Sequence, residues 1–141
     1  MFKYLRDVHV YETDLMGIVH HSNYLRYCEE ARVEWCRSNG LLKPNQSDRD
    51  KAVFGLTVYE THVKHIKPAR YGDHLQIAVQ VKVVGVRIVF QYRITLQDTV
   101  LSLAETIHCN IDADFKVRRV EKQMVEAVEK NLWTETWLSN L

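Results

Sequence analysis

Residues that can carry a proton, a charge or an unusual backbone geometry crowd a short stretch near the start of the chain: Glu12, Asp14, Gly17, His20 and His21. A carboxylate such as Asp14 can activate water as a general base or attack a carbonyl carbon directly. Free N–H groups at a helix start can bind the oxyanion that develops, at about 3 kcal/mol for each well-aimed donor. The stretch therefore predicts a hydrolytic site, provided that a helix begins just after it.

The alternative role for Asp14 is structural. Aspartate is common at helix N-caps and in turns, where its carboxylate accepts hydrogen bonds from backbone N–H groups. Residue spacing alone leaves the catalytic and the capping interpretation equally open.

The residues after this stretch have the apolar spacing of a helix. Apolar residues recur at intervals of four, three and four: Tyr24, Cys28, Ala31 and Trp35. This spacing predicts a helix with one buried stripe, and Leu25 and Tyr27 are expected to widen its apolar side. Ser22 or Asn23 is the expected N-cap, and Gly40 is the expected stop. The first N–H groups of such a helix lack partners within it and point back toward the titratable stretch.

The pattern changes after Lys43 to Lys51, a polar stretch typical of a surface loop. Alternating apolar residues predict four strands, each with one buried face: Val53 to Ile66, Leu75 to Val83, Val86 to Leu96, and Leu101 to Ile111. Gly85 marks a turn between two of them. The alternation slips near Glu60 to Val63, which predicts a β-bulge.

The order of these elements predicts the fold class. The titratable stretch is expected to begin as a strand at Val10, and a last amphipathic helix carries Val120, Met124, Val128 and Leu132, ahead of Trp133 and Trp137. Strand, helix, four strands and helix indicate an α+β protein. We predict a curved antiparallel sheet of about five strands wrapped around one long central helix, plus a C-terminal helix. The 141 residues are expected to form a single domain, 1–141.

Composition narrows the possible partners and the compartment. The formal net charge of +1 gives no basic field for nucleic acid. The longest apolar stretches are far too short to cross a membrane, and the first residues do not resemble a signal peptide. Three scattered cysteines, Cys28, Cys36 and Cys109, suit a reducing cytoplasm rather than a disulfide framework.

Three motifs carry a resemblance to a known family. The segment YETDLMGIVHHSNYLRYCEEAR, residues 11–32, resembles the signature of the hotdog-fold acyl-CoA thioesterases, in the branch of 4-hydroxybenzoyl-CoA thioesterase and the YbgC-type enzymes. The matching positions are Asp14, Gly17, Val19, Asn23, Tyr24, Glu29 or Glu30, and Arg32. HIKPARYGDHLQI, residues 65–77, and LAETIHCNIDADFKVRRV, residues 103–120, resemble the family's approach to its long strand and its last strand.

The resemblance implies hydrolysis of an acyl-CoA thioester by water, without a metal or other cofactor. It implies that Asp14 is the catalytic carboxylate and that the backbone N–H of His21 polarises the thioester carbonyl, with a side-chain role for His21 left open. Gly17, Val19, His20, Tyr24 and Glu12 are implied to lie near the substrate. Glu12 and His20 depart from the family pattern, so the acyl preference stays open.

Two other functions stay open: a hotdog-fold acyl hydratase or dehydratase, and a non-catalytic acyl-binding module. A metal site is not expected, because His62 and His65 would point to opposite faces of a strand. Acyl-CoA is the expected partner, together with further copies of the chain in a homodimer or a dimer of dimers. We expect Val53 to Ile66 to lie at that interface.

Overall fold

The computed structural model describes residues 1–41 and 56–139. Its strands and helices are β1 (Phe2–Asp7), α1 (Ser22–Ser38), β2 (Thr57–His65), β3 (His74–Val84), β4 (Arg87–Leu96), β5 (Thr99–Ile111), β6 (Val117–Arg118) and α2 (Lys122–Lys130). A single turn of 3-10 helix, Val10–Glu12, lies between β1 and α1. The polar stretch Lys43 to Lys51 and the first residues of the strand predicted from Val53 lie outside the described residues.

The strands form one antiparallel sheet. Its order is β1-β3-β4-β5-β2, with the short β6 paired to β5. β3, β4 and β5 follow one another as hairpins, and Gly85 adopts a φ of 63° in the first of these turns, as the sequence predicted. The predicted bulge in β2 is present, but the register shifts between Val58 and Glu60, at the start of the predicted range.

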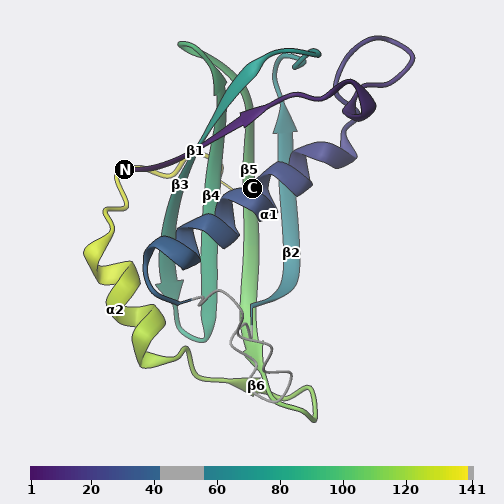
Figure 1. The fold of residues 1–141 in the computed structure, drawn as a ribbon. Helices are drawn as coiled ribbons and strands as arrows, with labels where there is room; N and C mark the ends of the chain where they lie inside the picture. The colour runs from purple at the N-terminus through teal and green to yellow at the C-terminus, as the bar shows by residue number, and fades with distance from the viewer. Residues whose placement is uncertain (42–55, 140–141) are drawn as a thin grey trace.

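The long helix α1 crosses one face of this sheet (Figure 1). The predicted stripe of Tyr24, Cys28, Ala31 and Trp35 is buried in the core, and the Trp35 ring meets Phe90 of β4 edge to face at 5.4 Å. Tyr27 is buried as predicted, whereas Leu25 keeps 37% of its surface exposed because it faces away from the sheet. One helix against one antiparallel sheet confirms the predicted architecture.

The start of α1 differs from the prediction by one position. His21 is the N-cap, not Ser22 or Asn23, and Gly40 follows the C-cap residue Asn39 with a φ of 71°, as expected of a helix stop. The prediction of a strand from Val10 is wrong. β1 ends at Asp7, and Val10–Glu12 form the 3-10 helix instead.

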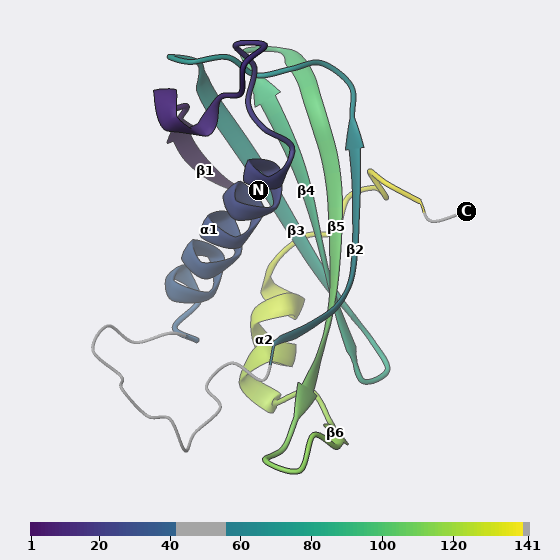
Figure 2. The same ribbon diagram turned by 90° about the vertical axis from the view of Figure 1, so that its right-hand side faces the viewer.

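The C-terminal region also corrects the prediction. α2 ends at Lys130, and Leu132 is 76% exposed. Figure 2 shows α1 and α2 on the same side of the sheet, while the chain after α2 continues to the opposite side. There the side-chain amides of Gln80 and Gln91 donate to the carbonyls of Glu135 and Leu138 at 2.5 and 2.6 Å. Both glutamines are therefore buried, although the alternation had placed them on a solvated face.

Candidate active site

Residues 13–19 form a small hairpin between the 3-10 helix and α1. The Asp14 N–H donates to the Ile18 carbonyl at 2.8 Å, and Thr13 and Val19 pair as an antiparallel bridge. The Gly17 N–H closes the turn on the Asp14 carbonyl at 3.0 Å, with a φ of 76° that glycine adopts without strain. The hairpin places Asp14 at its first corner, before the chain enters α1.

The carboxylate of Asp14 is half-buried and partly engaged. Its Oδ1 accepts the N–H of Met16 at 2.8 Å, which is the side-chain bond of an aspartate turn. Its Oδ2 has no hydrogen-bond partner among residues 1–41 and 56–139. Asp14 thus caps the hairpin turn and not α1, and one carboxylate oxygen is left for chemistry.

The first turn of α1 has one unused donor. An α-helix begins with four N–H groups that find no partner inside it. Here the Ser22 N–H donates to His20 Nδ1 at 3.2 Å, the Asn23 N–H to the His20 carbonyl at 2.9 Å, and the Tyr24 N–H to the His21 carbonyl at 3.3 Å. The His21 N–H has no acceptor within the described part of the chain. The resemblance implied this N–H as the donor to the thioester carbonyl, and that role stays a prediction.

Glu12 has a different environment from Asp14. It is only 4% exposed, its Oε2 lies 2.7 Å from the Arg6 guanidinium, and its Oε1 accepts the His9 N–H at 2.8 Å. The Glu12 carbonyl in turn accepts the His20 N–H and the Asn23 side-chain amide, at 2.9 and 2.8 Å. Glu12 therefore ties β1 to the start of α1. Sequence reasoning missed Arg6, because an ion pair across two elements leaves no periodic signal.

Behind the hairpin, buried residues form a support. Val19 and Tyr24 are each 3% exposed. The Val19 N–H donates to the Ala69 carbonyl at 2.9 Å, and the Ala69 N–H donates to the Tyr24 hydroxyl at 3.1 Å. The predicted substrate contacts of Val19 and Tyr24 stay predictions, whereas Gly17, His20 and His21 are exposed beside Asp14 in sequence.

The end of β2 brings in a further histidine. The His65 ring meets the Tyr24 ring edge to face at 4.8 Å. Its pKa is lowered, first by burial and then by the nearby His21. His65 was not among the predicted site residues, since only the pairing of β2 beside the start of α1 brings it there.

Comparison with known proteins identifies the family. Residues 8–130 match the family described as the thioesterase-like superfamily, which is most of the chain. The chain belongs to the thioesterase-like superfamily. This confirms the resemblance inferred from the three motifs, and the helix-on-sheet architecture is the hotdog fold shared by these proteins.

Similar proteins support this membership. An Aquifex aeolicus protein is 34% identical over 91% of this chain and 98% of its own length, and a crystal structure from the same organism, 34% identical, superimposes with a TM-score of 0.75 over 91% of this chain and 99% of that one. The acyl-CoA thioester hydrolase YbgC of Escherichia coli is 28% identical over 89% of this chain and 93% of its own. The 1,4-dihydroxy-2-naphthoyl-CoA hydrolase of Nostoc punctiforme is 26% identical over 92% and 88%, respectively.

Other nucleophiles and ligands in this thioesterase-like chain are poorly placed. Burial raises the pKa of the Cys28 thiol to about 12 and that of Cys36 to about 11, so neither is a ready thiolate. His62 pairs in register with Glu105 and His65 with Ser102, on opposite faces of β2 as predicted. The described residues contain no group of three histidine, cysteine, aspartate or glutamate side chains that could hold a metal ion, nor a helix that could span a membrane.

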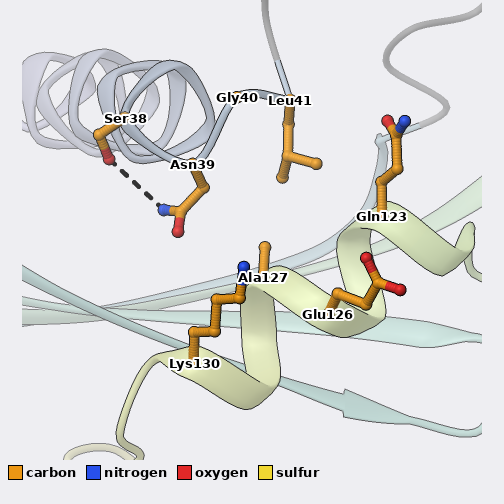
Figure 3. Close-up of a pocket in the computed structure, with 8 residues that line it drawn as sticks. All are labelled: Ser38, Asn39, Gly40, Leu41, Gln123, Glu126, Ala127 and Lys130. Atoms are coloured by element: carbon orange, nitrogen blue, oxygen red, sulfur yellow. Dashed lines mark hydrogen bonds between the residues drawn. The ribbon is translucent and has the colours of Figure 1, made fainter.

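A pocket of about 350 Å³ lies at the far end of α1 (Figure 3). It is bounded by the end of α1 and by α2, with Ser38, Asn39, Gly40, Leu41, Gln123, Glu126, Ala127 and Lys130 around it. A helix of 17 residues is about 25 Å long. This pocket is therefore remote from the hairpin and from the His21 N–H, and it is not part of the candidate active site.

Proposed function

We propose that this protein hydrolyses an acyl-CoA thioester to the free acid and coenzyme A. The observation that carries the proposal is the N–H of His21, the one donor at the start of α1 without an acceptor among the described residues, which follows a hairpin where one Asp14 carboxylate oxygen also lacks a partner in that part of the chain. The YbgC and naphthoyl-CoA relatives are named for this chemistry. A donor for an oxyanion and a carboxylate are the two groups that thioester hydrolysis needs.

The proposed reaction assigns one role to each group. The His21 N–H binds the thioester carbonyl oxygen and stabilises the negative charge that develops on it. Asp14 either removes a proton from the attacking water or attacks the carbonyl carbon itself. In the first route the proton that Asp14 takes from water passes to the departing coenzyme A thiolate. In the second route an acyl–Asp14 anhydride forms as the thiolate leaves, and water then hydrolyses the anhydride and restores the carboxylate. In both routes the carbon–sulfur bond breaks and water supplies the new oxygen of the acid.

The neighbouring residues divide between surface and support. We propose that Gly17 and His20, which are exposed, lie against the substrate, and that Glu12, Val19 and Tyr24 shape the site from behind the hairpin. The side chain of Glu12 is engaged by Arg6 and His9, so its contribution is to hold the loop.

We also propose that the active form is a homodimer or a dimer of dimers. β2 is an edge strand, hydrogen-bonded to β5 on one side. The backbone groups on the other side of an edge strand can hydrogen-bond to a strand of a second chain. Val58 and Tyr59 on β2 are 47% and 54% exposed, and Leu15 and Met16 at the hairpin tip are almost fully exposed. A second copy would cover both surfaces.

We also propose a cytoplasmic location for this protein, because its free cysteines suit a reducing compartment.

The proposal is tested first by a substrate panel. Aliphatic and aromatic acyl-CoA esters, and acyl carrier protein esters, are assayed by the release of free thiol. Turnover of at least one ester, without added metal, is expected. Stoichiometric binding of every ester without any turnover would favour a non-catalytic acyl-binding module, and addition of water to an enoyl-CoA would favour a hydratase.

The donor itself is tested by a matched pair of substitutions. His21→Pro removes the backbone N–H, and the φ of −54° at this position suits proline. His21→Ala removes the same ring but keeps the N–H. We expect kcat of His21→Pro to lie about 10²–10³-fold below that of His21→Ala, the usual loss for one oxyanion donor. Equal kcat values in two folded variants would remove the His21 N–H from the mechanism.

A further inference from the structure

The imidazole of His20 is built into the start of α1. Its Nδ1 lies 3.2 Å from the Ser22 backbone nitrogen and 2.8 Å from the Ser22 hydroxyl. The backbone carbonyl of His20 accepts the Asn23 N–H at 2.9 Å. One residue therefore satisfies two of the four open donors of this helix, one with its ring and one with its main chain.

These contacts fix the protonation state of the ring. The Ser22 N–H can only donate, so Nδ1 must accept and carries no proton. The neutral ring then holds its proton on Nε2.

Within residues 1–41 and 56–139, the neighbours of His20 are other imidazole rings and a carboxylate that is already paired. The His21 ring lies against it, with ring centroids 4.2 Å apart, and His21 is in turn near enough to His65 of β2 to lower the pKa of His65. The nearest element before it contributes Glu12, whose carbonyl accepts the His20 N–H and whose carboxylate is paired with Arg6. Among the described residues, His20 forms no ion pair, with Asp14 or with any other carboxylate.

We propose that His20 is a positioning residue for the thioester hydrolysis, an inference that rests on the proposed function: its neutral ring occupies the Ser22 N–H, so that the His21 N–H is the one donor left for the substrate carbonyl. Without this cap, the first turn of α1 offers two adjacent open donors, and the loop that aims the His21 N–H loses one of its attachments to the helix.

Two substitutions of His20 test the cap. His20→Asn places a side-chain oxygen where Nδ1 lies, one bond beyond Cγ in both residues, and asparagine is a good helix cap. His20→Leu keeps the branching and removes the acceptor. The kcat and KM of the wild type and both variants are measured from pH 5 to 9 on the best ester of the panel.

We expect His20→Leu to lower kcat about tenfold or more at every pH while KM changes by less than about threefold, because the oxyanion develops only in the transition state. His20→Asn is expected to restore kcat at pH 8 to within about threefold of the wild type. Melting temperatures of the two variants serve to separate alignment from loss of folding.

The outcomes are distinct from those for the proposed function. A wild type that turns over normally, beside a His20→Leu variant with wild-type kcat, would overturn the inference alone. So would a folded His20→Asn variant with a kcat as low as that of His20→Leu, because a restored acceptor for the Ser22 N–H would then not restore the alignment. A wild type without turnover on any ester, or a His21→Pro variant equal to His21→Ala, would count against the proposed function, and the inference would fall with it.

Discussion

Because His108 is buried in the fold, we expect the free energy of unfolding to depend on pH. His108 lies on β5 under α1 and is fully buried. Its Nε2 is 2.7 Å from the Thr106 hydroxyl, which is 2.7 Å from the Tyr92 hydroxyl, and Arg32 donates to that Tyr92 oxygen at 3.1 Å. At the other end of this series of hydrogen bonds, Nδ1 of His108 is 3.2 Å from the Leu56 carbonyl.

The donor and the acceptor of each hydrogen bond in this series follow from the groups at its two ends. Arg32 can only donate, so the Tyr92 hydroxyl donates onward to Thr106, and Thr106 donates to His108 Nε2. The Leu56 carbonyl can only accept, so Nδ1 of His108 carries the proton. The ring is therefore neutral, and burial, with the charge of Arg32, lowers the pKa of His108 to about 4.

The expected loss of stability follows from that pKa. The ordinary value for histidine is about 6.5, so between about pH 6.5 and 4 the unfolded chain binds a proton at this position while the folded protein does not. The contribution of His108 is fully present above pH 6.5 and is lost as the pH falls toward 4. A difference of this size corresponds to about 3 kcal/mol in the free energy of unfolding.

The assay is urea denaturation at fixed protein concentration from pH 4 to 8, for the wild type and for His108→Asn. Asparagine keeps a donor toward the Leu56 carbonyl and does not titrate. The free energy of unfolding of the wild type should fall by about 3 kcal/mol more than that of the variant between pH 7 and 4. Parallel pH profiles for the two proteins would refute the neutral, buried histidine.

Further predictions concern the loop, the metal and the assembly. Glu12→Gln should lower the free energy of unfolding by about 1–3 kcal/mol, less than a fully broken buried ion pair because glutamine still accepts hydrogen bonds; an unchanged melting temperature would contradict the role of the Arg6 pair. Activity should survive dialysis against a strong chelator, and a loss that zinc restores would overturn the metal-free mechanism. Light scattering at micromolar concentration should show a dimer or tetramer, with Val58→Lys shifted toward monomer; a stable, active wild-type monomer would contradict the interface at β2.

The sheet and the central helix could be predicted because each has a periodic apolar signal. Alternation along β3, β4 and β5 located these strands to within about two residues, and the spacing from Tyr24 to Trp35 located α1. The burial of Gln80 and Gln91 could not be predicted. Their outward positions have the pattern of solvated residues, and only the return of the chain after α2 covers them with backbone acceptors.

The site could be predicted in part. The motif around Asp14 and the start of a helix indicated the carboxylate and the His21 N–H, since both depend on residues near in sequence. The functions of Glu12 and His65 depend on tertiary contacts, with Arg6 in one case and with Tyr24 in the other. Composition and spacing contain no record of such contacts. The cap by the His20 ring was also missed, because histidine is not a typical N-cap side chain.

The central claim is that Asp14 is the catalytic carboxylate, and the most direct measurement is the kcat of Asp14→Asn on the best acyl-CoA ester, with the melting temperature checked alongside. Asparagine keeps the size of the side chain and can still accept the Met16 N–H, so the hairpin turn should persist. The account predicts a fall in kcat of at least about a hundredfold, with KM changed far less. A folded Asp14→Asn protein with nearly normal turnover would show that Asp14 serves only the turn, and would contradict the account.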